Sequence, residues 1–249
     1  MNLPSLLHPL GSVLLIVAIT VSLLVWTRLA RKDARLPTIY LLGLLGGFLG
    51  AKLGFIFAEW RTWIDTPYFW PQMLAGKTIV GALLGGYFFV ELAKRQTGYG
   101  LPTGDLFALT APLGIVIGRI GCLVSGCCLG QVCPPTWYSL RDAAGETRWP
   151  AVPLEIIFNL LLLLIFLMLR RFRALPGQHF HLYLMAYGGF RFLHEFARDT
   201  PRLIGPFSGY HVLAGLLILL GGGGFLRRRA KSPLAHPAND PHPAPTRLD

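Results

Sequence analysis

Two arginines lie inside stretches of the chain that are otherwise apolar enough to be buried in a membrane. Arg119 sits in the run from 104 to 130, and Arg191 lies in a second candidate span. A charged side chain at the centre of a bilayer costs about 2.5–3.5 kcal/mol on insertion scales, so such residues face a cavity and have a polar partner. Because the guanidinium is a planar fork that binds phosphoryl oxygens in pairs, two converging arginines suit a lipid phosphate. The alternative is that each arginine neutralises a buried carboxylate and holds helices together.

The segment RFLHEFAR, residues 191–198, concentrates ionisable side chains on one helical face. Arg191, Glu195 and Arg198 are at positions i, i+4 and i+7, which share a face in an α-helix, and His194 lies beside that face. A polar stripe of this kind inside a membrane bundle lines a cavity instead of facing lipid. Glu195 either compensates the arginines only or also orients Arg191, and the two roles are compatible.

Lys52 and Glu155 are two further ionisable residues expected at membrane depth. Lys52 either extends its amine to the outer interface or adds a third positive charge to the cavity. It lies in a glycine-rich span, where we expect the missing side chains to permit close approach of a neighbouring helix.

The four cysteines have the spacing C-x4-C-C-x4-C, at Cys122, Cys127, Cys128 and Cys133. The charge pattern described below places them at the outer face of the membrane, where disulfides persist, and four cysteines allow three pairings. We expect structural cysteines that are buried or disulfide-linked. A zinc site is one alternative, but no CxxC pair or nearby histidine supports it, so no metal is expected. A catalytic thiol is the other alternative.

The composition is that of an integral membrane protein. Hydrophobic residues make up 53% of the chain and charged residues 14%, and the mean hydropathy is +0.52, whereas soluble domains carry about 25% charged residues. The net charge of +11 is spread over loops between apolar runs, so it indicates membrane topology and not nucleic-acid binding. The N-terminus lacks the features of a cleavable signal peptide, so we expect the first apolar segment to remain as a membrane helix.

The apolar runs predict an all-α, polytopic fold with about seven membrane-spanning helices in a single domain, residues 1–231. Their approximate ranges are 11–29, 38–58, 78–93, 104–124, 151–169, 179–197 and 209–226. An aromatic stretch before the third span, YFWPQML, is predicted to be interfacial or re-entrant. Residues 232–249 are rich in proline, alanine and polar residues and are predicted to form a disordered cytoplasmic tail.

The distribution of lysine and arginine orients the bundle. The loops after the first, third, fifth and seventh spans carry more than twice as many of these residues as the loops on the opposite side. Because positively charged loops stay in the cytoplasm, the N-terminus is predicted outside and the C-terminus inside.

Five motifs occur in a fixed order along the chain: GAKLGF, GALLGG, TGDLFALTAPLGIVIGRIG with SGCCLG, RWPAVPLE, and GGFRFLHEFAR. From about residue 38 to about residue 226 the chain therefore resembles the bacterial prolipoprotein diacylglyceryl transferase family. The resemblance implies a multi-pass enzyme of the bacterial inner membrane that needs no cofactor. Such an enzyme transfers the diacylglyceryl group of phosphatidylglycerol to the lipobox cysteine thiol of a prolipoprotein signal peptide. A thioether forms and glycerol phosphate leaves.

The resemblance also implies roles for residues that match the motifs. Arg119 and Arg191 match the family's essential arginines, which are expected to hold the lipid phosphate and stabilise charge on the leaving group. The catalytic candidates are Arg119, Arg191, Glu195 and His194. The other residues expected to line the substrate cavity are Arg198, Gly130, Lys52 and Glu155.

The chain departs from the family pattern at polar positions. The signature G-R-I-G-N-F-I-N-G-E has its two asparagines and its glutamate replaced by Cys122, Ser125 and Cys127. Val80 replaces a histidine that is the family's candidate base. Either His194, Glu195 or a water polarised by arginine then activates the thiol, or the chain is a paralogue with an altered acceptor. The rival functions are a cysteine-dependent membrane protein that handles thiols or metals, and a non-catalytic lipid-binding member.

Overall fold

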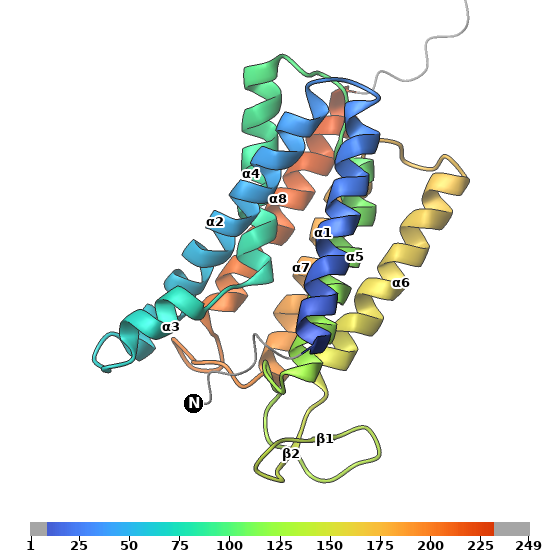
Figure 1. The fold of residues 1–249 in the computed structure, drawn as a ribbon. Helices are drawn as coiled ribbons and strands as arrows, with labels where there is room; N and C mark the ends of the chain where they lie inside the picture. Colours follow the sequence, from blue (N-terminus) through green and yellow to red (C-terminus); the bar gives the residue numbers. More distant parts are fainter. Residues whose placement is uncertain (1–8, 232–249) are drawn as a thin grey trace, which may run out of the picture.

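The apolar runs form long helices, because a helix satisfies its own backbone hydrogen bonds where lipid offers none. The computed structural model describes residues 9–231. Each of the expected span ranges coincides with a helix to within a few residues. The helices are α1 (Pro9–Ala30), α2 (Leu36–Trp63), α3 (Phe69–Ala75), α4 (Ile79–Thr97), α5 (Gly104–Val124), α6 (Ala151–Arg171), α7 (His179–His194) and α8 (Gly209–Lys231) (Figure 1).

Four of these helices are long and apolar enough to cross a membrane, namely α2, α5, α6 and α8. A fifth span results if α3 and α4, which are bent by 58° at a short break, are taken together. The aromatic stretch predicted to be interfacial or re-entrant is thus the short helix α3. The prediction of a helical, multi-pass membrane protein is confirmed.

Helices α2 and α4 pack backbone against backbone. A Cβ atom placed on Gly50 would lie 2.3 Å from the carbonyl oxygen of Gly81, and one on Gly85 would lie 2.3 Å from that of Gly46. No side chain fits at these positions without separating the helices. The glycine-rich span therefore serves close helix approach, as predicted.

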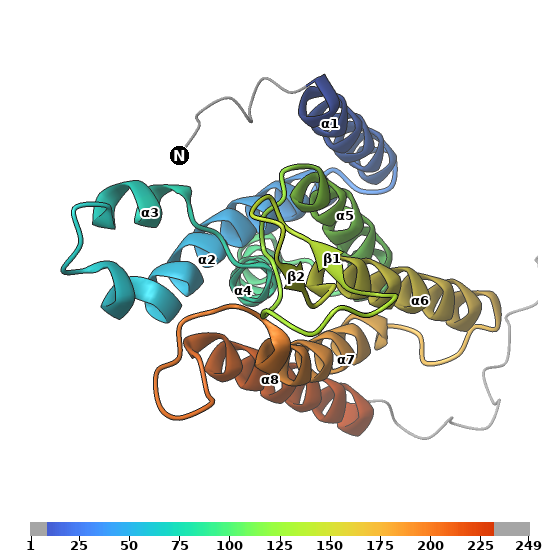
Figure 2. The ribbon, with the colours of Figure 1, turned by 90° about the horizontal axis from the view of Figure 1, so that it is seen from below.

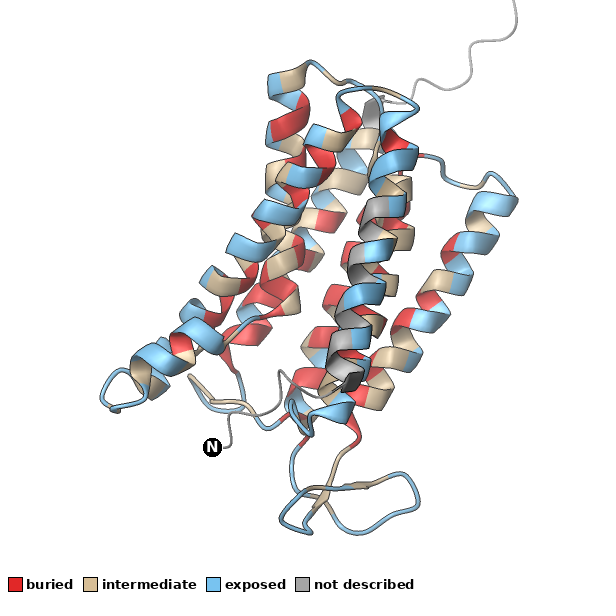
Figure 3. Cartoon of the chain, in the orientation of Figure 1, coloured by how far each residue is buried: buried red, intermediate tan, exposed pale blue. Residues whose placement is uncertain are grey.

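The outward faces of the helices are apolar, and the polar groups lie between helices. Large apolar side chains are exposed along the bundle, with Leu53 65%, Met168 60%, Leu193 71% and Leu219 72% exposed. Figure 3 shows this pattern as pale outward faces and buried residues between helices. Such a surface is stable only in contact with lipid.

A short β-hairpin, which the sequence did not lead us to expect, follows α5. Its strands β1 (Leu140–Arg141) and β2 (Thr147–Arg148) are antiparallel, and both the hairpin and α3 lie at the same end of the bundle (Figure 1). Arg148 forms ion pairs with Asp142 at 2.8 Å, Glu146 at 3.0 Å and Asp199 at 2.8 Å. The hydrogen bonds from Arg148 hold the pKa of the Asp142 carboxyl below its usual value.

Seen from this end, the hairpin lies in front of the middle of the bundle, and α1 lies at its edge (Figure 2). The segment before the hairpin is tied to the chain after α7, because the amide of Gln131 donates to the carbonyl of Ala197 at 2.9 Å. The hairpin therefore covers one end of the helices that carry the ionisable residues. The predicted disordered tail, 232–249, lies outside the described residues.

Candidate functional site

A buried carboxylate on α6 joins three arginines. Glu155 is 0% exposed, and its Oε2 atom lies 2.8 Å from Arg119, 3.8 Å from Arg191 and 3.9 Å from Arg198. The hydroxyl of Tyr187 donates to its other oxygen at 2.6 Å. Three separate segments of the chain thus converge on Glu155.

A second buried carboxylate, Glu195, follows α7 directly. Its Oε2 atom accepts from Arg191 at 2.8 Å and lies 3.6 Å from the Nε of Arg198. Its Oε1 atom accepts hydrogen bonds from the hydroxyls of Thr200 at 2.7 Å and Ser208 at 3.4 Å. Every oxygen of this carboxylate therefore has a donor.

The expected helical face of Arg191, Glu195 and Arg198 is only partly helical. Helix α7 ends at His194, a 3-10 turn η2 (Glu195–Ala197) follows, and Arg198 is extended. Arg202 stabilises this break, because its guanidinium donates to the carbonyls of Glu195, Phe196, Arg198 and Pro206 at 3.1–3.2 Å. The three side chains still meet, but through a turn and not through helical spacing.

The cluster of Arg119, Arg191, Arg198, Glu155 and Glu195 holds three positive and two negative side chains. The first two arginines each have a carboxylate at 2.8 Å. Arg198 has only contacts at 3.6 and 3.9 Å, and in the described part of the chain its side chain donates no hydrogen bond. Arg119 and Arg191 therefore neutralise buried carboxylates, as one of the two interpretations predicted, and one positive charge of the cluster is left over.

Several donors in this cluster are buried without a hydrogen-bond partner among the described residues. They are Nε of Arg119, Nε and one terminal nitrogen of Arg191, and Nε and one terminal nitrogen of Arg198. A buried donor without a partner costs about 1–3 kcal/mol, and more when it is charged. An anionic ligand with several acceptor oxygens would satisfy these donors.

Three uncharged polar residues, Asn159, Tyr183 and Tyr187, extend the network and were missed from the sequence. Asn159, one helical turn after Glu155, accepts from the hydroxyl of Tyr183 at 2.9 Å and donates to the carbonyl of Glu155 at 2.8 Å. Tyr187 lies one turn before Arg191. The sequence held two signs of this network. One is the asparagine within the otherwise apolar α6, and the other is the pair of tyrosines spaced at helical turns before Arg191.

Gly130 occupies a position with no room for a side chain. A Cβ atom there would lie 2.4 Å from the carbonyl oxygen of Trp149. Gly130 also forms an isolated antiparallel bridge with Arg198. The glycine thus places the loop after α5 directly beside the least paired arginine.

Two other candidate residues, His194 and Lys52, make contacts outside the charged cluster. His194 is buried, its ring stacks on Phe190 with centroids 4.8 Å apart, and neither ring nitrogen has a partner among the described residues. Lys52 donates to the carbonyl of Leu74 at the end of α3 and forms no ion pair with the cluster in the described part of the chain. The buried Val80 offers no polar group.

Three cysteines converge at the C-terminal end of α5. The Sγ atoms of Cys122, Cys127 and Cys128 all lie within 4.8 Å of one another, and a terminal nitrogen of Arg119 lies 3.9 Å from Cys122 Sγ. All four cysteines are free, and Cys127 and Cys128 are exposed. The expectation of buried or disulfide-linked cysteines therefore fails for this group.

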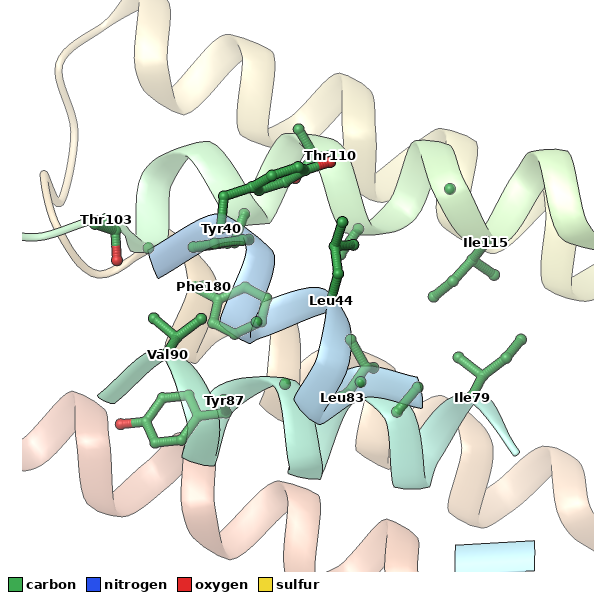
Figure 4. A pocket seen from close by; sticks show the side chains of 18 of the residues that line it. Tyr40, Leu44, Ile79, Leu83, Tyr87, Val90, Thr103, Thr110, Ile115 and Phe180 are labelled. Atoms are coloured by element: carbon green, nitrogen blue, oxygen red, sulfur yellow. The ribbon is translucent and has the colours of Figure 1, made fainter. Parts of the chain in front are cut away.

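A mostly apolar cavity of about 560 Å³ lies against α5. It opens between α2, α4, α5 and α7 (Figure 4). Its walls include Tyr40, Leu44, Leu83, Ile115, Gly118 and Phe180. Gly118 immediately precedes Arg119, so one helix contributes both to the apolar cavity and to the charged cluster.

The chain is similar to known proteins of one family. The family model described as prolipoprotein diacylglyceryl transferase matches residues 10–227. A phosphatidylglycerol–prolipoprotein diacylglyceryl transferase of Clostridium tetani is 34% identical over 65% of this chain and 68% of its own length. Enzymes with this name from Clostridium perfringens and Vibrio parahaemolyticus are 28% and 29% identical, each over 79% of this chain, and over 79% and 73% of their own lengths. The chain belongs to the prolipoprotein diacylglyceryl transferase family.

Proposed function

We propose that the protein transfers the diacylglyceryl group of phosphatidylglycerol to the lipobox cysteine thiol of a prolipoprotein. The observation that carries this proposal is the buried cluster with three arginines and two glutamates. It retains one positive charge and several donors that have no hydrogen-bond partner among the described residues. A phosphodiester carries one negative charge and several acceptor oxygens. It therefore matches the cluster in charge and in hydrogen bonding.

The arginines differ in what they have available for the lipid. Arg198 has no short carboxylate contact, so it is the guanidinium that can turn to the phosphate at the smallest cost. Arg119 and Arg191 are held by Glu155 and Glu195, and each still has at least one N–H group without a hydrogen-bond partner in the described part of the chain. Because they are positioned before the reaction, they can stabilise the charge that develops when the bond to the phosphate oxygen breaks.

Two further requirements of the reaction are a site for the acyl chains and an acceptor for the proton of the thiol. The apolar cavity beside α5 suits the acyl chains, while the headgroup faces Arg119. The attacking thiol must lose its proton, and Glu195 already accepts from Arg191, Thr200 and Ser208. Neither ring nitrogen of His194 has a hydrogen-bond partner within residues 9–231, so we propose its imidazole as the acceptor of that proton.

We also propose the seven-span topology with the N-terminus outside and the C-terminus in the cytoplasm of a bacterial inner membrane. The loops rich in lysine and arginine lie at the end of the bundle opposite to α3 and the hairpin (Figure 1). On this orientation the charged cluster lies towards the outer face. A prolipoprotein whose signal peptide spans the membrane presents its cysteine on that side.

The test is a reaction of the purified protein with phosphatidylglycerol and a peptide that carries a lipobox cysteine, followed by the mass of the peptide. We expect a peptide heavier by one diacylglyceryl group, and release of glycerol phosphate. Arg119→Lys keeps the charge but loses the planar fork, and we expect a rate about 10²–10³-fold lower, as for loss of a transition-state donor. The matched control is Arg141→Lys on the exposed hairpin, with the rate unchanged.

Two results would count against the proposal. A folded protein that binds phosphatidylglycerol but forms no thioether would be a non-catalytic lipid-binding member. An unchanged rate in Arg119→Lys would mean that the fork of this arginine takes no part in the reaction.

A further inference from the structure

The cysteine group of Cys122, Cys127 and Cys128 has the geometry of a metal-binding site. The three sulfurs lie within 4.8 Å of one another although they come from the last turn of α5 and the loop after it. Cys128 is held at a φ of 61°, which is uncommon for a residue other than glycine. Strained backbone of this kind persists where the surrounding structure requires it, often at functional sites.

The chemistry of three thiols selects a thiophilic cation. Thiolates prefer Zn²⁺ and Cu⁺ over hard cations, and a Zn–S bond of about 2.3 Å places the sulfurs of a tetrahedral site about 3.8 Å apart. The three sulfurs, which all lie within 4.8 Å of one another, are close enough to reach that separation around one ion. No fourth His, Cys, Asp or Glu joins the group within residues 9–231. Three protein ligands leave one position open, as in catalytic zinc sites.

The position of the group connects it with the proposed reaction. Cys122 Sγ lies 3.9 Å from Arg119, which we place at the lipid phosphate. The acceptor substrate is itself a thiol, the ligand type that zinc favours. The histidine that the family pattern places at position 80 is a valine here, so thiol activation needs another source.

We propose that Cys122, Cys127 and Cys128 bind one Zn²⁺ ion whose fourth position takes the sulfur of the acceptor cysteine. This inference rests on the proposed transferase function. The acceptor thiol loses its proton to His194 when its sulfur coordinates the metal. The sulfur lone pair then forms the C–S bond, the C–O bond to the phosphate breaks, and its electron pair leaves with glycerol phosphate. The metal keeps its charge throughout, so no oxidant or reductant is needed.

The size of the effect follows from thiol ionisation. A free cysteine has a pKa of about 8.5, so only a few per cent is thiolate at pH 7, whereas a thiol bound to zinc is deprotonated. Metal binding can therefore increase the reactive fraction by up to about 30-fold. A metal-depleted enzyme should lose up to this factor in rate and recover it when Zn²⁺ is added.

The first experiment measures metal binding without turnover. The full chain, purified under reducing conditions, is loaded with Zn²⁺ or Co²⁺, and metal per chain is determined. We expect one ion per chain, lost in Cys128→Ser and in Cys127→Ala. Cys133→Ser is the matched control, because Cys133 lies outside the sulfur group, and it should keep the ion. Absence of a bound ion in the reduced wild type, or its retention in both Cys128→Ser and Cys127→Ala, would overturn the site.

The second experiment tests the open position. Addition of a lipobox peptide to the Co²⁺ form should change the thiolate-to-cobalt absorption, whereas a peptide with serine for cysteine should not. Transfer should fall on chelation and return with Zn²⁺. An unchanged spectrum together with an unaffected rate would overturn the acceptor role even with one ion bound. If the spectrum responds but the fully loaded protein forms no thioether, the metal site stands and the proposed transferase function fails.

Discussion

Replacing Glu155 by glutamine removes the negative charge on which three arginines converge. The carboxylate is 0% exposed, and its Oε2 atom lies 2.8 Å from Arg119 and within 3.9 Å of Arg191 and Arg198. Glutamine has nearly the same volume, so packing is preserved. Its amide either presents hydrogens to Arg119, which is itself a donor, or turns them towards Tyr187.

The expected cost follows from leaving a buried guanidinium without its partner. Breaking a buried ion pair by removing one member destabilises a protein by about 3–5 kcal/mol. For a chain of this size, 1 kcal/mol lowers the midpoint of thermal unfolding by about 2–4 °C. We therefore expect Glu155→Gln to lower the midpoint in detergent by about 6–20 °C.

The assay is thermal unfolding of the purified variants, with and without phosphatidylglycerol. The matched control is Glu146→Gln, because the Glu146 side chain is 53% exposed in its pair with Arg148, and exposed pairs contribute little. Phosphatidylglycerol should raise the midpoint of Glu155→Gln more than that of the wild type, since its phosphate replaces the missing charge. If both variants unfold at the same temperature, the reasoning about Glu155 is refuted.

Two further predictions concern the region after α5. Gly130→Ala places a Cβ atom 2.4 Å from the Trp149 carbonyl oxygen. The loop must move to make room, so transfer activity should fall at least about tenfold. The control is Gly189→Ala, where a Cβ atom meets nothing within 4 Å, and it should leave transfer activity unchanged. Arg148 lowers the pKa of the Asp142 carboxyl in the folded protein. The ionised carboxylate therefore stabilises the hairpin fully at pH values above the pKa of the unfolded chain. This stabilisation is lost as the pH falls through the lower pKa of the folded protein. Protease cleavage of the hairpin should therefore increase at strongly acidic pH, and Asp142→Asn should show that increase already at pH 7; equal cleavage of the two proteins at pH 7 would contradict this.

The helices and the identity of the charged residues could be predicted from the sequence, because both follow from local hydrophobicity. An arginine in an apolar run is conspicuous whatever its partner. The partner itself depends on how helices pack: Glu155 and Arg119 are on different helices, and no spacing rule connects them. Their contact at 2.8 Å is a result of tertiary structure.

The end of α7 shows a second limit of the sequence. Continuous helical spacing from Arg191 to Arg198 predicted one helix, but the helix ends at His194. The carbonyls of the turn after the helix need donors, and Arg202 donates to those of Glu195, Phe196 and Arg198. Helical spacing alone does not show that a nearby arginine will stabilise a turn in place of continued helix.

The convergence of the cysteines also depends on backbone geometry. Their spacing matched no common zinc motif, so structural cysteines that are buried or disulfide-linked were expected. The turn with positive φ at Gly126 and Cys128 brings three sulfurs together. Such angles are not encoded in cysteine spacing.

The most direct test of the central claim is the affinity of the purified protein for phosphatidylglycerol in wild type and in Arg198→Gln. Arg198 is the arginine of the cluster without a short carboxylate contact, so its loss should leave the fold intact. One hydrogen bond between charged groups is worth about 1.5–3 kcal/mol, and we predict a dissociation constant roughly 10- to 150-fold higher. The control Arg141→Gln should match the wild type. An equal affinity in folded Arg198→Gln and Arg141→Gln would contradict the claim that this cluster holds the lipid phosphate.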